Sequence, residues 1–184
     1  WLHRTWSHRG LVPIPLSPLS LVFRAVSEWK RRKSVAKSVP VPVVVVGNIY
    51  VGGTGKTPVT IALVRALREK GWTPGVISRG YGRSEDDVRL VTPNADAMLT
   101  GDEPLLIAQE TKAPVAVSRY RHRAAQKLLE LHPEVDLIIS DDGLQHHALA
   151  RDFEIAVVGA RGLGNGWVLP AGPLRESPAR LDTV

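Results

Sequence analysis

Short apolar runs alternate with segments of helical periodicity along most of the chain. The runs are rich in β-branched residues and cover residues 41–46, 74–78, 88–92, 114–118, 135–140 and 153–159. Runs of this length, bounded by turn-forming residues, predict strands that are buried on both faces. Between them, apolar residues recur every three or four positions, as in Val59, Ala62, Leu63, Ala66 and Leu67. Strands that alternate with helices predict an α/β fold with a mostly parallel sheet flanked by helices.

The first 40 residues have a different pattern, and we expect them to form a segment separate from residues 41–184. Ser17 is suited to cap a helix that has Pro18 as its first residue. One face of this helix is apolar and consists of Leu19, Val22, Phe23, Val26 and Trp29. Four consecutive basic residues follow at 30–33. An amphipathic helix with a tryptophan and a basic end is typical of a membrane-surface helix, although a helix packed on its own domain is the alternative.

The distribution of charge favours the membrane interpretation. Residues 1–40 contain eight of the 24 lysines and arginines and a single acid, Glu28, so the net charge of +6 is concentrated there. Such a segment attracts anionic lipid, nucleic acid or an anionic substrate. We favour an anionic membrane over nucleic acid, because basic and aromatic residues do not interleave along the rest of the chain. The apolar run at residues 11–23 is too short to span a bilayer, and the absence of cysteine excludes disulfides and thiol-bound metals.

A glycine-rich turn joins the first predicted strand to the first helix of the α/β part. Its residues are Gly52, Gly53, Thr54, Gly55, Lys56 and Thr57. The phosphate-binding loop (P-loop) of nucleoside triphosphate enzymes consists of a strand, a glycine loop, Gly-Lys-Thr and a helix. In this loop the lysine reaches the β- and γ-phosphates, and the threonine hydroxyl binds Mg²⁺. Backbone N–H groups and the helix N-terminus bind the anion. ATP and Mg²⁺ are therefore the predicted cofactors. An ordinary glycine-rich turn is the alternative, since Tyr50 stands where the general pattern has glycine.

The strand predicted at residues 135–140 is followed by Asp141 and Asp142. A carboxylate at the end of a buried strand is the partner that a phosphate-binding loop requires, because it holds Mg²⁺ directly or through water. We therefore predict a metal site made of Thr57, Asp141 and Asp142. The adjacent His146 and His147 point in different directions on a helix, which argues against a metal site of two histidines.

Two interpretations are open for the carboxylates in the segment Thr100-Gly-Asp-Glu-Pro104, which precedes another predicted helix. Thr100 with Glu103 three residues later matches a capping box, and acids in a first helical turn interact favourably with the helix dipole. Alternatively, Asp102 is a catalytic base, since a hydroxyl acceptor benefits from a carboxylate within hydrogen-bonding reach.

Further polar groups lie in turns and at helix starts, where they are suited to contact an anionic ligand. They are Arg79, Tyr81 and Arg83 in a glycine turn, Arg119 and Arg121 at a helix start, Gln145 and His146 after the aspartate pair, and Asn165 and Arg175 in a glycine- and proline-rich loop. Arginines at a helix N-terminus oppose the dipole unless an anion is nearby. Loops that follow strands form ligand sites in open α/β sheets. The alternative is that the arginines point into water.

Five motifs occur in a distinctive order. They are Val-Gly-Gly-Thr-Gly-Lys-Thr-Pro at 51–58, Ser-Arg-Gly-Tyr-Gly-Arg at 78–83, Gly-Asp-Glu-Pro at 101–104, Asp-Asp-Gly-Leu-Gln-His at 141–146 and Leu-Pro-Ala-Gly-Pro-Leu-Arg-Glu at 169–176. Together they resemble the tetraacyldisaccharide 4'-kinase family, the lipid A 4'-kinases of Gram-negative bacteria. The resemblance covers nearly the whole chain, and the missing glycine at Tyr50 is itself a feature of this family's loop.

The resemblance implies an enzyme at the cytoplasmic face of the inner membrane, bound peripherally or monotopically. It transfers the γ-phosphate of ATP to the 4'-hydroxyl of a tetraacylated glucosamine disaccharide 1-phosphate. Asp102 is then the catalytic base, Asp142 also serves the reacting centre, and Glu103 joins the polar groups above as a substrate-binding residue. Family members carry a second, C-terminal lobe, which implies that residues 41–184 are an incomplete kinase domain. We expect a monomer without a nucleic-acid partner.

Two other functions are compatible with this phosphate-binding loop. One is a non-kinase ATPase of the partitioning or cluster-assembly type, although Val51 replaces the signature lysine of that group. The other is a nucleotide-binding membrane module without catalysis. ATP turnover that depends on a lipid-linked sugar distinguishes a kinase from both.

Overall fold

A computed structural model of the chain describes residue 6, residues 13–80 and residues 87–184. These residues form two compact units. The first comprises the chain up to Ser34 together with Asn48–Thr54 and Ala156–Val184, and the second comprises Val35–Gly47 and Gly55–Ile155. The sequence-based division into residues 1–40 and 41–184 stays a prediction. Each unit is described by itself below.

A mostly parallel sheet runs through the second unit, as the alternation of apolar runs predicts. Its strands are β1 (Val43–Gly47), β2 (Pro74–Ser78), β3 (Arg89–Leu90), β4 (Val115–Val117), β5 (Leu137–Asp141) and β6 (Phe153–Ala156). The spatial order is β3-β4-β2-β5-β1-β6. Neighbouring pairs among β1, β5, β2 and β4 are parallel, and β3 is antiparallel to β4. Every residue of β1, β2 and β5 is buried, which explains why these strands are continuous apolar runs.

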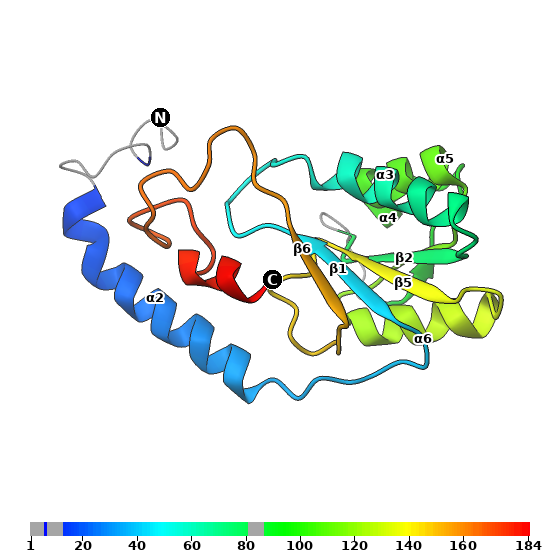
Figure 1. Cartoon of the computed structure of the whole chain (residues 1–184), viewed down its shortest axis with the longest axis horizontal. Helices are drawn as coiled ribbons and strands as arrows, with labels where there is room; N and C mark the ends of the chain where they lie inside the picture. The colour runs from blue at the N-terminus through cyan, green and yellow to red at the C-terminus, as the bar shows by residue number, and fades with distance from the viewer. Residues whose placement is uncertain (1–5, 7–12, 81–86) are drawn as a thin grey trace. The chain divides into compact units, whose positions relative to one another are not determined.

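Helices cover both faces of this sheet (Figure 1). The helices α3 (Lys56–Glu69) and α5 (Asp102–Thr111) pack against each other on one face, and α6 (Arg121–Leu131) packs against β2 and β4 on the other. A short helix, α4 (Ala97–Thr100), precedes α5. The approach of α6 is close at Gly75, where an added methyl group would lie 2.7 Å from Cδ2 of Leu128. The predicted α/β fold with a mostly parallel sheet is therefore confirmed.

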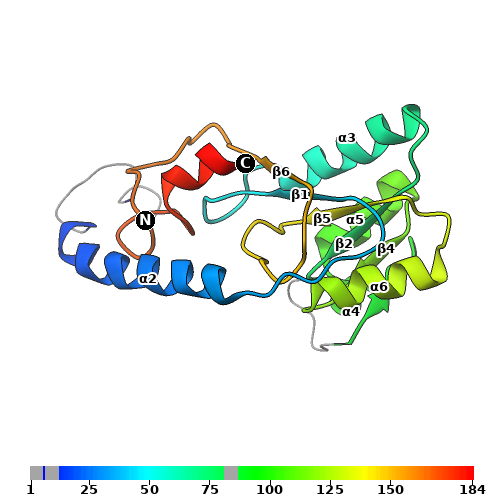
Figure 2. The same cartoon turned by 60° about the horizontal axis from the view of Figure 1, so that its bottom comes forward.

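In the first unit, α2 spans Pro13–Lys33, and Figure 2 shows it as one long helix. The sequence prediction that the helix begins with Ser17 as cap and Pro18 as first residue is wrong, because Pro18 lies inside the helix. The described helix instead begins at Pro13, which has the fixed φ that suits a first helical position. The buried Ser20 anchors the helix, since its hydroxyl donates a hydrogen bond to the carbonyl of Val168 (2.9 Å) and accepts one from the amide of Ala171 (2.9 Å).

The apolar face predicted for α2 is largely open to solvent. Leu19, Val22, Val26 and Trp29 are 45–61 % exposed, and Phe23 is half-buried. At the basic end, the ammonium of Lys33 lies 4.7 Å from the centre of the Trp29 ring. Among the described residues, we find no helix that is both long and apolar enough to cross a membrane.

The remainder of the first unit is built on residues 48–54 and the C-terminal segment. The amide of Val51 donates to the carbonyl of Pro173 (2.8 Å), and the amide of Arg175 donates to the carbonyl of Ile49 (2.6 Å). The segment ends in a 3₁₀ helix, η1 (Pro178–Thr183). These backbone hydrogen bonds hold the stretch that precedes α3 against the glycine- and proline-rich loop of the same unit.

Candidate functional site

The connection between β1 and α3 has the local structure that the glycine pattern predicts. Gly52 and Gly55 have φ values of 98° and 85°, which L-residues with a side chain rarely adopt. Gly55 is the residue before the helix, and α3 begins at Lys56. Within the first unit, the side-chain amide nitrogen (Nδ2) of Asn48 donates to the hydroxyl of Thr54 (2.8 Å) and holds the first half of the loop. A strand, a glycine loop and a helix that begins with Lys-Thr are thus confirmed.

In the second unit, Lys56 points to the end of β5. Its ammonium lies 3.6 Å from the Asp142 carboxylate, and its side chain is only 8 % exposed. Thr57 is similarly buried. A cation that is desolvated and held beside a carboxylate is placed to bind a phosphate group, so the structure brings together Lys56 and one of the predicted metal ligands.

Asp141 is the last residue of β5 and is fully buried. Its Oδ1 accepts a hydrogen bond from the hydroxyl of Thr60 at 3.0 Å, whereas its Oδ2 is buried with no hydrogen-bond partner among the described residues. Burial raises the pKa of Asp141 to about 6, and the Thr60 hydrogen bond opposes the rise. A buried carboxylate oxygen without a partner is costly unless a cation binds there, so the residues present fit a divalent metal ion.

The chemistry of these ligands suits Mg²⁺. Within the described parts of the chain, no group of three His, Cys, Asp or Glu side chains is arranged to hold a metal ion. Mg²⁺ does not need one, since it usually binds one or two carboxylates, substrate phosphates and water. Asp141, Asp142 and the hydroxyl of Thr57 supply oxygen ligands of this kind, and their assignment to the metal stays a prediction.

Arg121 holds the backbone at the aspartate pair. Its guanidinium is 3 % exposed and donates to the carbonyls of Asp141 (2.9 Å) and Asp142 (3.1 Å). Asp142 has a φ of 47°, an unusual conformation for a residue with a side chain that the surrounding structure must stabilise. Burial lowers the pKa of Arg121 to about 10, while Asp141 and Asp142 oppose this shift. The described role of Arg121 is to position Asp141 and Asp142, and substrate binding by Arg121 stays a prediction.

His146 lies next to Arg121, the residue that holds the aspartate pair. Its Nε2 accepts a hydrogen bond from the backbone amide of Arg121 at 3.4 Å. Burial and the nearby charges of Arg121 and Arg151 lower the pKa of His146 to about 4, so its imidazole is neutral at pH 7. A neutral ring is suited to hydrogen bonding with a hydroxyl rather than to pairing with a phosphate.

Asp102 lies at the beginning of α5, and the capping-box interpretation of this segment is wrong. Gly101 with a φ of 88° is the residue before α5 and offers no side-chain cap. Thr100 belongs to the preceding helix α4, and its hydroxyl donates to the carbonyl of Asp96 (2.9 Å). The capping prediction failed because a one-residue break between α4 and α5 turns Thr100 away. Asp102 and Glu103 are exposed first-turn acids, and the charge of Glu103 contributes to the raised pKa of Asp141.

The other predicted substrate-binding residues are distributed over both units. In the second unit, Arg79 and Arg119 are exposed and Gln145 is half-buried, and the charge of Arg79 acts on Arg121. In the first unit, Asn165 is buried and bonded to Ala171 and Trp167, and Arg175 is half-buried. Tyr81 and Arg83 lie outside the described residues. None of these contacts involves a substrate, so the assignment of these residues to substrate binding stays a prediction.

Comparison with known proteins identifies the family. A family model described as tetraacyldisaccharide-1-P 4'-kinase (LpxK) matches residues 12–184. The chain belongs to this kinase family. Tetraacyldisaccharide 4'-kinases from Herminiimonas arsenicoxydans and Acidovorax sp. (strain JS42) are 59 % and 52 % identical to it, over 96 % and 100 % of this chain. A crystal structure of the "apo" form of LpxK from Aquifex aeolicus in complex with ATP is 30 % identical, with a TM-score of 0.83 over 95 % of this chain and 57 % of that one.

The family membership confirms the resemblance carried by the five motifs. The chain spans about half the length of the curated relatives it matches, namely 51 % of the Herminiimonas and 56 % of the Acidovorax kinase.

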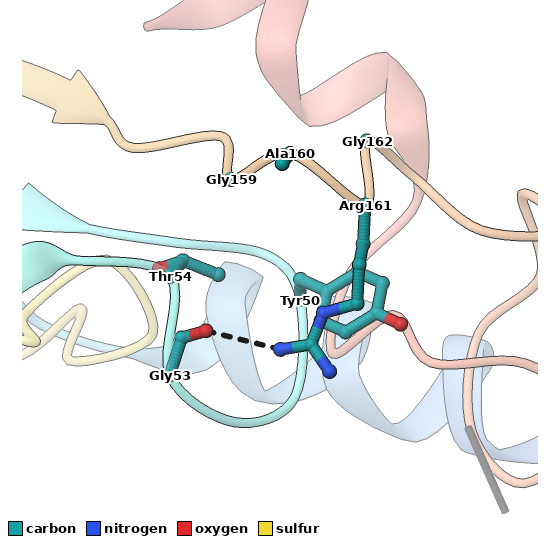
Figure 3. A pocket seen from close by; sticks show the side chains of 7 residues that line it. All are labelled: Tyr50, Gly53, Thr54, Gly159, Ala160, Arg161 and Gly162. Carbon is teal, nitrogen blue, oxygen red and sulfur yellow. Dashed lines mark hydrogen bonds between the residues drawn. The ribbon is translucent and has the colours of Figure 1, made fainter.

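Two residues near the site of this kinase-family chain were missed by sequence reasoning. Thr60 lies one helical turn after Thr57 and holds the carboxylate of Asp141. The spacing of three residues was a usable signal, because it places Thr60 on the same face of α3 as Thr57. Arg161, which donates to the carbonyl of Gly53 at 3.1 Å (Figure 3), had no such signal, since 108 residues separate the two positions.

Proposed function

We propose that residues 1–184 form the phosphate- and acceptor-binding part of a kinase that phosphorylates the 4'-hydroxyl of a tetraacyldisaccharide 1-phosphate with ATP. One observation carries the proposal: the ammonium of Lys56, at the start of α3, lies 3.6 Å from the Asp142 carboxylate. The neighbouring Asp141 has a buried carboxylate oxygen with no hydrogen-bond partner among the described residues. Phosphoryl transfer requires a cation that binds the phosphates, and it requires carboxylates that bind a metal ion. The names of the similar kinases support the choice of acceptor.

The consecutive residues Gly52–Thr57 are the proposed binding site for the phosphates of ATP. The glycines allow backbone N–H groups to point at the anion, and the N-terminus of α3 adds a favourable partial charge. Lys56 neutralises the β- and γ-phosphates. In this proposal the bound phosphates compete with Asp142 for the ammonium, which frees the Asp142 carboxylate for the metal or the reacting centre.

Thr57, Asp141 and Asp142 are the residues that would hold Mg²⁺. When bound, this ion neutralises the charge on the transferring phosphate and orients it. The contribution of the chain is to fix the ligands: the hydroxyl of Thr60 orients the carboxylate of Asp141, and Arg121 holds the backbone carbonyls at 141 and 142.

Asp102 is the proposed base that accepts the proton of the 4'-hydroxyl. Its exposed position at the start of α5 leaves the carboxylate accessible to a substrate. A further group of residues is proposed to bind the sugar and its phosphate. They are Glu103, the arginines Arg79, Arg119 and Arg121, and the polar side chains of Gln145 and His146. Asn165 and Arg175, which belong to the first unit, and Tyr81 and Arg83, which lie outside the described residues, are proposed as substrate-binding residues on the family resemblance of their motifs alone. Arginine suits this task because its planar guanidinium recognises phosphate with two N–H groups.

The acceptor carries acyl chains, so the enzyme is proposed to act as a monomer at the cytoplasmic face of the inner membrane. The exposed apolar residues of α2 and its four consecutive basic residues support this location. Apolar side chains enter the interface while lysines and arginines attract anionic headgroups.

The test of the proposed function is the dependence of phosphate transfer on the acceptor. An intact kinase that contains residues 1–184 is incubated with ATP labelled in the γ-phosphate, with and without the tetraacyldisaccharide 1-phosphate. We expect label in the lipid at the 4'-position and little release of inorganic phosphate without it. ATP hydrolysis at the same rate in the presence and absence of the lipid would overturn the proposal and favour a non-kinase ATPase.

Membrane binding through α2 gives a second prediction. Replacing Lys30, Arg31, Arg32 and Lys33 with glutamate should strongly weaken the binding of the intact kinase to vesicles that contain anionic lipid, since each basic residue near such a surface contributes about 1 kcal/mol. Co-sedimentation at low and high salt measures the effect, with vesicles of neutral phosphatidylcholine as the control. Unchanged, salt-insensitive sedimentation would show that these residues do not act on anionic lipid.

A further inference from the structure

The loop at residues 143–150 follows the aspartate pair, lies wholly in the second unit and carries Gln145 and His146. It contains turns but no helix or strand. At its beginning, the amide of Gly143 donates to the carbonyl of Val46 at 3.1 Å, which ties this end to β1. The middle of the loop lies outside the sheet, so its backbone carbonyl groups need other donors.

Arg151 supplies these donors. Its guanidinium donates to the carbonyls of Leu144 (3.2 Å), His146 and Leu149 (3.3 Å). It also pairs with the carboxylate of Glu154 at 2.9 Å, and the arginine side chain is only 14 % exposed. A guanidinium carries five N–H donors on a rigid plane, whereas an ammonium has its three donors on a single nitrogen. One arginine side chain therefore fixes three points of the loop, which a lysine could not do.

The ring of His146 has a defined hydrogen-bonding state. A backbone amide can only donate, so the Nε2 atom that accepts from the amide of Arg121 (3.4 Å) carries no hydrogen. The hydrogen of the neutral ring is therefore on Nδ1. Burial, with the charges of Arg121 and Arg151, lowers the pKa of His146 to about 4, which agrees with a neutral ring. Among the described residues, Nδ1 has no hydrogen-bond acceptor.

We propose that Arg151 is a positioning residue for the acceptor: it fixes the loop at 143–150 so that His146 presents its Nδ1–H group to an uncharged oxygen of the sugar. An uncharged donor suits a hydroxyl or carbonyl oxygen, whereas a phosphate is better matched by a cation. The inference rests on the proposed function, because it presumes that His146 meets the acceptor. Arg151 lies outside the five sequence motifs and acts through His146 rather than on the substrate.

The first test separates the acceptor from ATP. In an intact kinase that contains residues 1–184, Arg151→Lys should raise the KM of the tetraacyldisaccharide 1-phosphate about 3- to 10-fold, the change expected from one lost hydrogen bond. The Kd of Mg²⁺–ATP, measured by titration calorimetry, should be unchanged, because the residues proposed to bind ATP are intact.

A double-mutant cycle tests whether Arg151 acts through His146. His146→Ala should raise the KM of the acceptor to a similar degree as Arg151→Lys. The double variant should be no worse than His146→Ala alone, because a residue that acts through His146 has no effect once the imidazole is absent. Additive increases in KM would overturn the inference.

Nuclear magnetic resonance of the histidine ring gives a readout that does not depend on turnover. In the wild-type kinase with ¹⁵N-labelled histidine, the signals of His146, assigned by their absence in His146→Ala, should show a neutral ring with its hydrogen on Nδ1. In Arg151→Lys the ring should become a mixture of both neutral tautomers. A wild-type ring with its hydrogen on Nε2 would overturn the inference without any variant of Arg151.

Arg65→Ala is the matched control. Arg65 also donates to a backbone carbonyl and pairs with a carboxylate, both of Glu110, but it is exposed on α3. The control should change neither the KM of the acceptor, nor the Kd of ATP, nor the tautomer of His146. Melting temperatures close to that of the wild type establish that each variant retains the fold.

The outcomes separate this inference from the proposed function. Equal loss of affinity for ATP and acceptor in Arg151→Lys would overturn the inference, because Arg151 would then support the whole site. A wild-type KM in a folded Arg151→Lys variant would also overturn it, while lipid phosphorylation by the same protein would leave the proposed function standing. Absence of lipid phosphorylation in the wild type would contradict the proposed function, and a changed His146 tautomer in Arg151→Lys would still support positioning by Arg151.

Discussion

Replacing Lys56 with alanine is expected to reduce phosphate transfer by at least about 10²–10³-fold, the usual effect of removing one group that stabilises transition-state charge. The ammonium is the cation that α3 brings to the end of β5, and alanine leaves the β- and γ-phosphates without it. The fold should be retained, because the partner carboxylate of Asp142 is 31 % exposed and remains hydrated when the lysine is removed.

The measurement is lipid phosphorylation by the intact kinase at saturating ATP, together with thermal unfolding. Lys127→Ala is a matched control, since Lys127 also pairs with a carboxylate, Glu130 at 3.0 Å, but on the exposed surface of α6. The control should keep wild-type turnover. A folded Lys56→Ala variant with near wild-type turnover would refute the assignment of the phosphate-binding loop.

Asp102→Asn is expected to lower the rate of lipid phosphorylation by about 10²–10⁴-fold, the usual contribution of a general base. Asparagine has the size of aspartate but cannot accept the proton of the 4'-hydroxyl. The structure sharpens this test, because Thr100 belongs to α4 and Gly101 precedes α5, which removes the capping box as the reason for a carboxylate here. The affinity for ATP should be unchanged, since residues 52–57 are intact.

Asp96→Asn is the control for this substitution. Asp96 caps α4 by accepting a hydrogen bond from the amide of Met98 (2.8 Å), and asparagine caps a helix about as well as aspartate. Both stability and turnover of the control should therefore stay close to the wild type. If a stable Asp102→Asn enzyme keeps more than about a tenth of wild-type turnover at saturating ATP and lipid, Asp102 is not the base.

The failed predictions have a common physical origin. Ser17 and Thr100 are both good capping residues by composition, yet α2 begins at Pro13 and Thr100 lies inside α4. Capping patterns describe which residues tolerate a helix end, and several positions in a segment can satisfy them. The break at Gly101 places Thr100 in α4 rather than before α5, and no capping pattern in the sequence reveals that break.

The sequence alone determined the features that depend on neighbouring residues. Continuous β-branched runs specify strands buried on both faces, and the glycines at 52 and 55 allow the positive φ of the loop. Lys56 and Asp141 could be predicted as site residues because they lie at the start of a helix and at the end of a strand. Five motifs in order were sufficient for the family.

Only the tertiary structure decided the contacts that shape the site. Thr60 meets Asp141 across 81 positions, and Arg121 reaches the carbonyls of Asp141 and Asp142 from a different helix. An arginine at a helix start has the same sequence pattern whether it points into water or into the core. Burial distinguishes the two, because a desolvated guanidinium must find acceptors, and which acceptors lie within reach depends on how α6 packs on the sheet.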